Sequence, residues 1–549
     1  MPTHEVTNQP PPRTGDTYAE DVALAEAVAR EGGAWADDEL HALGALAGDP
    51  AWHDRGRAAN EHRPELRTHA RFGHRIDEVA YHPAYHELMR TAVGHGLHAA
   101  PWALDRAGAH VVRAAKFLLW SRVDAGHLCP MSMTYAVIPS LRRAPAVAAE
   151  WEPRVTAAVY DPRLVPADQK AGALFGMAMT EKQGGSDVRA NSTRAVPAGD
   201  EDASLLTGHK WFCSAPMSDA FLVLAQAPEG LSCFLVPRHT PDGARNPFRL
   251  QRLKDKLGDR SNASAEVELA DTWGRRIGEE GRGVATIIEM VAHTRLDCAV
   301  GAAAGMRHGL AEAAWHVAHR RAFGARLADQ PLMRAVVADL AVESEAATAL
   351  ALRLARAFDA AAGDAHEAGL RRLAMPVAKY WLCKRAPVHA AEALECLGGN
   401  GYVEESGMPR LFRQSPLNGI WEGSGNVQCL DVLRALVRSP ESVEAFLAEV
   451  DGAAGADRHL DAAAQDLRAA LTDGAEATAR STAEATARVT VERMALVLQA
   501  ALLVRHGDPA VADAFVRTRL AGQGGRAFGT LPTGADLPRI LARAHPALA

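Results

Sequence analysis

The segment at residues 419–427, GIWEGSGNV, places one carboxylate, Glu422, between a tryptophan and a run of small residues. Such a run fits either a solvated surface turn or a catalytic base whose backbone must come close to a flat ligand. Gly423 and Gly425 lack the Cβ atoms that would block that approach. The segment therefore makes Glu422 a candidate base whose role depends on the other motifs.

A second candidate site lies at residues 175–195, FGMAMTEKQGGSDVRANSTRA. Gly-Gly-Ser-Asp is ordinary turn chemistry, so the segment fits a loop at a domain boundary. It also fits a ligand cradle, because small residues let backbone amides approach a planar, carbonyl-rich ring while Thr180 and Ser186 offer hydroxyl groups. By itself the segment leaves both interpretations open.

Two further segments contain groups that bind flat or phosphorylated ligands. Residues 208–216, GHKWFCSAP, place Trp211 on a predicted strand, where the indole either fills the core or stacks beside a ring. Residues 319–334, HRRAFGARLADQPLMR, lie near the end of a long predicted helix. Arg320 or Arg321 there is either solvated helix charge or a guanidinium that donates two parallel hydrogen bonds to a pyrophosphate.

Several common catalytic signatures do not occur in the sequence. There is no GxxxxGK[ST] phosphate loop and no HExxH zinc motif, and GxSxG fails at both Ser186 and Ser424. GGNG at 398–401 follows a helical pattern rather than a strand, which argues against a dinucleotide-binding fingerprint. The histidine pairs at 82/86 and 316/319 lack an obvious third ligand, so we predict no metal site.

Length and composition indicate a multidomain, largely helical protein. The 549 residues exceed one ordinary core, 48% are hydrophobic, and only 5% are aromatic. A net charge of −7 argues against a surface that binds nucleic acid throughout, although a local basic face remains open. The seven cysteines form no CxxC pair, and no apolar run reaches the ~20 residues that cross a bilayer. We therefore expect a soluble, cytoplasmic protein without membrane contact.

Changes in periodicity along the chain predict its organisation. Apolar residues recur every three or four positions in most of the chain, whereas short Val-, Leu- and Phe-rich runs bounded by turn residues fill one central stretch. The expected fold is mainly α with a central antiparallel β domain. Its predicted parts are a flexible arm (1–16), an α-helical N-terminal domain (17–172), the β domain (173–282), a helical bundle (283–440) and a C-terminal helical domain (441–549).

Taken together and in this order, the segments resemble the acyl-CoA dehydrogenase family. MTEKQGGSD is similar to the family's flavin loop, KWFCSA to its tryptophan-containing strand, and RRAFG with Gln330 to the segment that holds the cofactor's pyrophosphate. ECLGGNGY and GIWEGSGN complete the set, which covers about residues 175–430. The sequence TEKQGGSDV and the additional region after residue 440 most resemble the family's AidB-like subgroup, which consists of flavoproteins of the adaptive response to alkylation.

This resemblance implies a fold of N-terminal helices, a middle β domain and a four-helix bundle, with FAD between the last two. It also implies a base at Glu422, assisted by Arg295, and a homo-oligomer, usually a dimer of dimers, in which a neighbouring subunit grips the adenosine diphosphate half. The residues that it assigns to FAD are Met179, Thr180, Ser186, Trp211, Phe212, Cys213, Ser214, Arg320, Phe323, Gln330, Gly398, Gly399, Trp421, Gly423, Ser424 and Asn426.

Two positions depart from the family pattern. Cys213 stands where the family usually has a threonine that meets the flavin edge, and a thiol is a weaker donor, so Ser214 or a backbone amide is an alternative partner. Some members place the base on the helix near Arg295, but the residue before it here is Thr294. Glu422 is then the candidate base that remains.

The resemblance leaves two functions open. One is an AidB-like, DNA-associated flavoprotein of the alkylation-damage response with acyl-CoA dehydrogenase activity, and the other is a metabolic acyl-CoA dehydrogenase without DNA binding. The C-terminal region has a modest excess of arginines, which are either ordinary solvated helix charges or contacts to double-stranded DNA phosphates. The predicted DNA-binding residues are Arg505, Arg517, Arg519 and Arg526.

Overall fold

The computed structural model describes residues 3–199, 202–476 and 480–549, and its contacts divide the chain into two compact units. The sheet unit comprises residues 51–106 and 123–294. The bundle unit comprises residues 1–50, 107–122 and 295–549. Across the described ranges, no helix combines the length and the apolar character that spanning a membrane requires.

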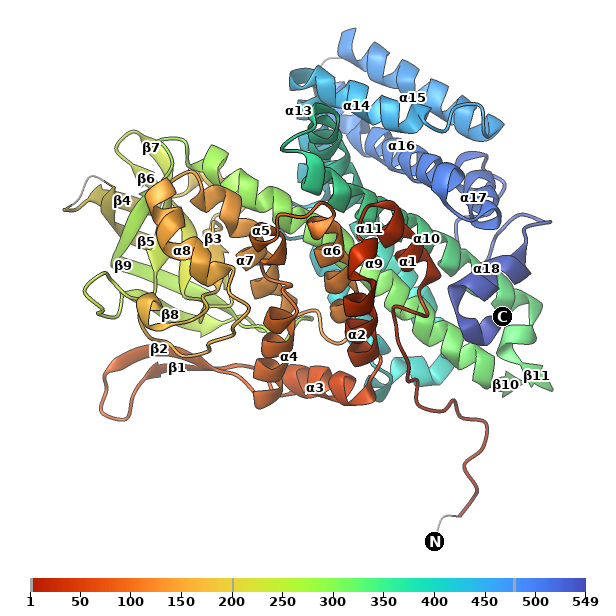
Figure 1. Ribbon diagram of the computed structural model, residues 1–549, viewed down its shortest axis with the longest axis horizontal. Helices are drawn as coiled ribbons and strands as arrows, with labels where there is room; N and C mark the ends of the chain where they lie inside the picture. The colour runs from red at the N-terminus through yellow and green to blue at the C-terminus, as the bar shows by residue number, and fades with distance from the viewer. Residues whose placement is uncertain (1–2, 200–201, 477–479) are drawn as a thin grey trace. The chain divides into compact units, whose positions relative to one another are not determined.

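The sheet unit combines short helices with the strands that carry the flavin-loop and tryptophan motifs (Figure 1). One helix, α7, is buried over nearly all its length, so it forms the helical part of this unit's core. The helices are α3 (Pro50–Glu61), α4 (Pro83–Gly94), α5 (Ala100–Ala103), α7 (Leu128–Leu141) and α8 (Pro145–Val155). The strands are β1 (Glu65–His69), β2 (Arg75–Ala80), β3 (Phe175–Ala178), β4 (Arg194–Pro197), β5 (Ala203–Ser214), β6 (Ala220–Ala227), β7 (Gly230–Pro237), β8 (Phe248–Leu253) and β9 (Ser264–Ile277).

The central sheet, seven-stranded within the described residues, is mixed rather than purely antiparallel. Strands β6, β7, β9, β5 and β4 pair in a closed ring, while β3 joins β6 and β8 joins β9. Both β3 and β4 run parallel to β6, and the other pairings are antiparallel. The β domain is therefore mainly antiparallel, as predicted, with two parallel pairings to β6 as exceptions. Parallel neighbours need a long connection, and the β4–β5 pair supplies it between β3 and β6.

A hairpin of β1 and β2 interrupts the stretch 17–172, for which the sequence pattern predicts only helices. Helix α3 ends at Glu61, and Pro64 follows three residues later. Because a proline drives the preceding residue into an extended conformation, the chain continues as a strand instead of a new helix. The hairpin packs against β8, where the Leu250 amide donates to Asp77 and Arg75 donates to the Leu250 carbonyl.

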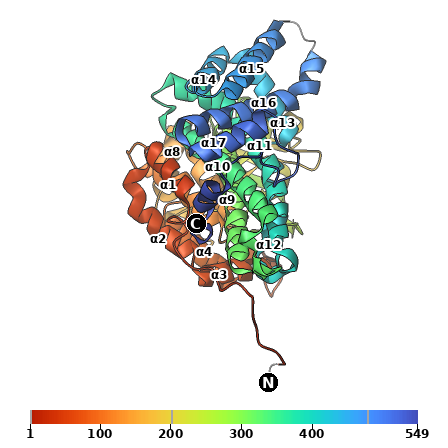
Figure 2. The ribbon, with the colours of Figure 1, turned by 90° about the vertical axis from the view of Figure 1, so that its right-hand side faces the viewer.

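The bundle unit is built around long helices that pack along one another (Figures 1 and 2). The first turns of α9 belong to the sheet unit and the remainder to the bundle unit. The helices of the bundle unit are α1 (Val22–Arg30), α2 (Asp37–Ala47), α6 (Ala109–Ser121), α9 (Gly283–His319), α10 (Pro331–Ala360), α11 (Ala365–Cys396), α12 (Met408–Gln414), α13 (Gly425–Arg438), α14 (Pro440–Asp451), α15 (Arg458–Glu476), α16 (Arg480–His506), α17 (Pro509–Phe515) and α18 (Leu537–Ala544).

A short hairpin, β10 (Arg321–Ala322) and β11 (Ala325–Arg326), follows α9, where the pattern predicts a continuing helix. Its two turn residues, Phe323 and Gly324, have φ values of +51° and +82°. Two successive positive φ angles characterise the tight turn that matches the twist of a two-residue hairpin. The helix prediction is therefore wrong at residues 321–326, because the turn and not the flanking charge pattern determines the local structure.

The C-terminal helices pack against the bundle helices through buried ion pairs as well as apolar side chains. Arg353 on α10 binds Glu367 on α11 and Glu449 on α14, with N–O distances of 2.8–3.1 Å. All three side chains are under 10% exposed. Each carboxylate accepts from two guanidinium nitrogens, so Arg353 makes two bidentate ion pairs. Together they fix α14 against α10 and α11.

Two other arginines from the C-terminal region make similar contacts. Arg519 Nη2 lies 2.6 Å from Asp339 Oδ1 and 3.2 Å from Glu343 Oε2, and both acids are almost completely buried on α10. Arg543 on α18 binds Glu345 on α10 and Glu26 on α1. Residues 441–549 therefore fold into one compact unit with the bundle.

Replacing Arg353 by methionine is expected to lower the free energy of unfolding of the bundle unit by about 3–5 kcal/mol. The change keeps the apolar stem but leaves Glu367 and Glu449 buried without their cation. Chemical denaturation followed by circular dichroism measures the loss.

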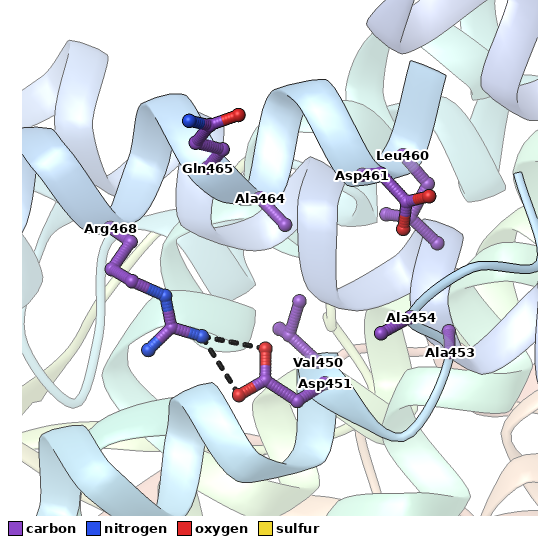
Figure 3. Close-up of a pocket in the computed structure, with 9 residues that line it drawn as sticks. All are labelled: Val450, Asp451, Ala453, Ala454, Leu460, Asp461, Ala464, Gln465 and Arg468. Carbon is purple, nitrogen blue, oxygen red and sulfur yellow. Dashed lines mark hydrogen bonds and ion pairs between the residues drawn. The ribbon is translucent and has the colours of Figure 1, made fainter. Parts of the chain in front are cut away.

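The control is Arg468→Ala, which removes an exposed pair with Asp451 (Figure 3). That variant should change the unfolding free energy by no more than about 1 kcal/mol. Equal effects of the two variants would contradict a special role for Arg353.

Acid should destabilise the bundle unit through the same pairs. Burial alone raises the pKa of Glu449, but the Arg353 guanidinium outweighs it and holds that pKa below its ordinary value near 4.5. Arg385 and Arg519 have the same effect on the pKa of buried Glu343. A carboxyl group whose pKa is lower in the folded state than in the unfolded state stabilises the fold at any pH above its unfolded-state pKa. That stabilisation is lost as the pH falls through the folded-state pKa. Melting temperatures measured from pH 7 to pH 3 should therefore fall below about pH 4.5, and less steeply in Arg353→Met than in the unaltered protein.

Candidate functional site

The flavin-loop segment and the tryptophan strand meet within the sheet unit. The backbone N–H of Trp211 on β5 donates to the Thr180 carbonyl at 2.9 Å. The Asn191 side chain donates to the Met179 carbonyl at 2.9 Å. These bonds hold residues 179–180, which directly follow β3, beside the end of β5. Two motifs that lie about thirty residues apart in the sequence thus form one surface.

A buried acid, Glu181, anchors the loop that follows. It accepts from Lys210 Nζ at 2.9 Å, from the Ser192 backbone N–H at 2.7 Å, and from the Thr193 backbone N–H at 3.1 Å. Burial by itself raises the pKa of Glu181, but the bonds from residues 192–193 and the Lys210 charge together lower it well below its ordinary range. Glu181 is therefore an ionised structural acid, and it fixes the loop at both ends.

The loop leaves hydrogen-bonding groups free for a ligand. Within the described residues, the hydroxyl groups of Thr180 and Ser186 have no hydrogen-bond partner, and Ser186 is exposed. A Cβ added to Gly185 would lie only 2.4 Å from Thr180 Oγ1, so the backbone needs glycine to fold this closely over the threonine. Free hydroxyls beside a glycine backbone fit a flat ring that is rich in carbonyl and ring-nitrogen acceptors.

Trp211 and Phe212 lie where the pairing of β5 with β9 is interrupted, between Lys210 and Cys213. Such an irregularity turns side chains away from their regular positions in a strand. The Phe212 side chain is 52% exposed, and Lys254 Nζ lies 3.2 Å from the centroid of the Trp211 ring. The cation covers one face of the indole, which leaves the rest of the half-buried ring for another contact.

The thiol of Cys213 lies inside the sheet rather than on its surface. Its side chain is fully buried in the apolar cluster with Phe221 and Ala265, and burial raises its pKa to about 12. The Ser214 hydroxyl, on the other side of the strand, lies 3.1 Å from the Ser264 hydroxyl. Of the two, Ser214 is the group in this structure with a polar side chain close to the surface.

In the bundle unit, the residues assigned to the adenosine diphosphate half of FAD lie around the β10–β11 hairpin. Phe323 at its tip is 99% exposed. Gln330, the residue before α10, donates its side-chain amide to the Ala322 carbonyl at 3.3 Å. Gly398 and Gly399 begin a short 3₁₀ helix, and an added Cβ on either would meet no atom within 4 Å. These positions are open to solvent in a single chain.

The N-terminal arm joins these two groups of residues. Asn8 pairs through its side chain with the backbone N–H and C=O of Arg321, at 2.8 and 2.9 Å. Arg320 Nη1 donates to the Asn8 carbonyl at 2.5 Å, and Asn400 donates to the Gln9 side chain at 3.4 Å. Part of the segment predicted as a flexible arm therefore lies against the predicted pyrophosphate-binding residues, and Arg320 retains other donors for a ligand.

Glu422 has a left-handed backbone, with a φ of +57°, and Gly423 follows at +97°. A non-glycine residue in this region is uncommon and strained, and such strain concentrates at functional sites. Arg295 Nε donates to the Glu422 carbonyl at 3.0 Å, so the structure brings the two predicted catalytic residues together. Trp421 is half-buried and donates its indole N–H to Asn418.

The two residues predicted beside the cofactor after Glu422 begin helix α13. Ser424 precedes its first turn, and its hydroxyl makes no capping bond and has no partner among the described residues. Asn426 is exposed and accepts from Arg488 Nε at 3.0 Å. The amide N–H groups of the first turn of α13 favour a negatively charged or carbonyl oxygen nearby.

The sequence patterns did not identify Lys379 and Gln428, which contact the same segment. Lys379 Nζ donates to the carbonyls of Trp421 and Gly423, and the Gln428 amide donates to those of Glu422 and Gly423. Lys379 lies in the helical run AMPVAKYWLCK, where one lysine reads as an ordinary surface residue. No local signal shows that it faces residues 421–423.

Three of the four arginines predicted to bind DNA have acidic partners within the bundle unit. Arg505 pairs with Glu449 at 3.2 Å, Arg517 with Asp513 at 3.1 Å, and Arg519 with two buried acids on α10. Arg526 is exposed and has no partner among the described residues. The structure thus does not gather the four side chains into one free basic face.

A recess of about 180 Å³ lies apart from all of these motifs, where the end of α14 faces α15 (Figure 3). Its floor is apolar, and the Arg468–Asp451 pair closes one side. The residues that line it are Val450, Asp451, Ala453, Ala454, Leu460, Asp461, Ala464, Gln465 and Arg468. It contains none of the candidate site residues.

Three family models match the chain in sequence order. The description "Adaptive response protein AidB N-terminal domain" matches residues 8–162, "Acyl-CoA dehydrogenase, middle domain" residues 176–272, and "Acyl-CoA dehydrogenase, C-terminal domain" residues 281–437. The chain is 46% identical to AidB of Escherichia coli (strain K12) over 527 residues, 95% of each protein. The chain belongs to the acyl-CoA dehydrogenase family.

Within this family the chain is AidB-like. It is an FAD-dependent oxidoreductase with the acyl-CoA dehydrogenase fold. It is also 31% identical to acyl-CoA dehydrogenase family member 11 of Caenorhabditis elegans, over 71% of this chain and 65% of that one. The crystal structure of ACDH-11 of C. elegans in complex with C11-CoA superposes with a TM-score of 0.84 at 26% identity, covering 99% of this chain and 93% of that one. These matches confirm the acyl-CoA dehydrogenase fold predicted from the motifs.

Proposed function

We propose that this protein oxidises an acyl-CoA thioester between its α and β carbons, with Glu422 as the base. The observation that carries the proposal is the strained, left-handed backbone of Glu422, which Arg295 holds by its carbonyl. A glycine would occupy that conformation without strain, so a carboxylate there points to a use for the side chain. The C. elegans relative, crystallised with C11-CoA, supports a CoA thioester as substrate class.

Each unit, taken by itself, carries residues suited to one part of the cofactor. Thr180, Ser186 and the half-buried Trp211 of the sheet unit offer free hydroxyl groups and an aromatic surface for the flavin ring. In the bundle unit, Arg320 and Gln330 offer a guanidinium and an amide at the hairpin for the adenosine diphosphate half. When bound there, FAD would supply the acceptor for the hydride equivalent that leaves the β carbon.

The protein's own part in the reaction is to remove and hold a proton. The Glu422 carboxylate takes the α-proton, which a thioester carbonyl acidifies. The charge that develops on the thioester oxygen needs N–H donors, and the backbone N–H groups next to the glycine-rich turn are the candidates in this segment. The absence of side chains at Gly423 and Gly425 allows a ligand to come close to them.

We also propose that the protein acts as a homo-oligomer, a dimer of dimers, in the cytoplasm. Large apolar side chains stand exposed in a single chain beside the adenosine-binding segments, among them Phe323 (99%), Leu332 (85%) and Tyr402 (82%). Exposed apolar side chains next to a binding segment are candidates for contact with a partner subunit. All seven cysteines are free and buried, which supports a reducing compartment.

Replacing Glu422 by glutamine should leave FAD bound but stop flavin reduction by acyl-CoA. The amide keeps the size of the side chain but cannot accept the proton. Anaerobic titration with a panel of acyl-CoAs, followed by the loss of flavin absorbance, measures the reaction. Glu405→Gln, an exposed acid in the same unit, is the matched control and should reduce at the normal rate. A glutamine variant at 422 that reduces as fast as the unaltered protein excludes this base.

DNA association in the alkylation response is a second candidate function, and the resemblance to AidB supports it. Arg526, the exposed arginine without a partner, is the most accessible of the predicted contacts. Arg519 is the least available, because turning outward would leave Asp339 buried without a cation and would remove one of the two arginines that bind Glu343. Phosphate contacts of this kind respond strongly to salt.

Arg526→Glu should weaken the binding of double-stranded DNA and reduce the slope of log affinity against log salt by about one. Gel shifts of the full chain over a series of salt concentrations measure both quantities. Arg249→Glu, which changes an exposed arginine of β8 by the same charge, controls for net charge. The absence of any DNA shift in low salt would favour the metabolic acyl-CoA dehydrogenase without DNA binding. Binding that is insensitive to salt would contradict phosphate recognition.

A further inference from the structure

Lys379 on α11 is a buried lysine without a carboxylate partner among the residues that the structure describes. Four lysines are buried in the described chain, and three of them, Lys116, Lys170 and Lys210, form ion pairs at 2.5–2.9 Å. Lys379 is only 1% exposed, and no described carboxylate lies within ion-pair distance of it. Burying an ammonium without a counter-ion is costly, so the position calls for an explanation beyond packing.

Its ammonium instead binds two backbone carbonyls that flank the candidate base. Lys379 Nζ lies 2.8 Å from the Trp421 oxygen and 2.5 Å from the Gly423 oxygen. The carbonyl between them, that of Glu422, accepts from Arg295 at 3.0 Å. Three successive carbonyls therefore point at cations from α9 and α11.

Gln428 completes this arrangement from α13. Its amide nitrogen lies 3.1 Å from the Glu422 oxygen and 3.0 Å from the Gly423 oxygen. The Gln428 side-chain oxygen is buried and has no donor among the described residues. The side chain thus leaves its own acceptor unsatisfied while its donors bind the segment, as expected if holding these carbonyls is its main role.

We propose that Lys379 is a positioning residue for the reaction: with Arg295 and Gln428 it forms a carbonyl clamp that imposes the left-handed backbone of Glu422 and aims its carboxylate. Relaxation of that backbone to a right-handed conformation would swing the 422 and 423 carbonyls off their donors. The inference rests on the proposed role of Glu422 as the base, and it adds what fixes that base in place.

We also expect the ammonium to favour the ionised form of the base, because a nearby cation stabilises a carboxylate. Burial raises the pKa of the Cys298 thiol, and among the charges that act on it Lys379 lowers that pKa while Glu422 raises it. The charged and titratable groups around residues 421–423 are Arg295, Asp297 and Cys298 on α9, Lys379, Cys383 and Lys384 on α11, and Asp431 on α13.

The test compares Lys379→Met with Lys379→Gln in the full-length FAD-loaded protein. Methionine removes the donors and the charge, so the plateau rate of flavin reduction should fall about tenfold to a hundredfold through misplacement of the base. Glutamine keeps N–H donors without charge and should recover part of that rate. In both variants the acid limb of the pH–rate profile should move to higher pH, because loss of the cation raises the pKa of the base.

Hydrogen exchange provides a readout that does not depend on activity. Peptides covering residues 417–430 should exchange faster in Lys379→Met than in the unaltered protein, whereas those from the rest of α11 should not change. Lys116→Met, which removes a buried ammonium from the same unit, is the matched control and should leave both the exchange of 417–430 and the pH profile unchanged.

The outcomes separate this inference from the function on which it rests. If the unaltered protein reduces with acyl-CoA and Glu422→Gln does not, but Lys379→Met shows normal exchange and a normal pH profile, the clamp is wrong and the base stands. If Glu422→Gln reduces normally, the base is wrong, and faster exchange in Lys379→Met would still establish the clamp as a structural device. Loss of FAD or of cooperative unfolding in Lys379→Met with a normal Lys379→Gln would reduce its role to packing.

Discussion

The position of the Glu422 backbone depends on charged side chains that join α9, α11 and α13. Arg295 binds the Glu422 carbonyl with one nitrogen and Asp431 of α13 with another, at 3.0 and 2.8 Å. Arg372 of α11 binds the second oxygen of the same Asp431. A guanidinium that holds a carbonyl and a carboxylate together cannot move without losing both. The loop of Glu422 is therefore fixed by three helices, which gives a site more precision than a free loop would have.

The C-terminal helices extend this network to the far end of the chain. Glu449 of α14 shares Arg353 with α11, and Arg488 of α16 binds Asn426 in the first turn of α13. The family model for the dehydrogenase C-terminal domain ends at residue 437, yet the helices beyond it make buried contacts with the same bundle. The additional region is thus structurally joined to the helix that begins three residues after Glu422. Any ligand that it binds would act on a body that includes the candidate base.

The sequence predicts those parts of the site that local chemistry encodes. The glycine-rich turn around Glu422, the loop before Ser186 and the tryptophan of β5 could each be found from composition and order. The β10–β11 hairpin and the β1–β2 hairpin could not, because each is a short extended piece inside a strongly helical pattern. Lys379 and the carbonyl of Trp421 lie more than forty residues apart and meet only after α11 has packed. No window of local sequence contains that pair.

Backbone strain gives independent support for the site. Within the described part of the bundle unit, the non-glycine residues with positive φ are Asn8, Phe323 and Glu422. Each lies in a segment assigned to the cofactor or to the base, or directly hydrogen-bonded to one. Left-handed backbone costs such residues of order 1 kcal/mol or more, and it persists only where the surroundings impose it. Asparagine tolerates this conformation, whereas phenylalanine and glutamate gain nothing from it locally. At 323 and 422 the strain is therefore imposed by the surrounding fold and not by the residue itself. At 422 glycine would relax the backbone but remove the only carboxylate of the segment 419–427.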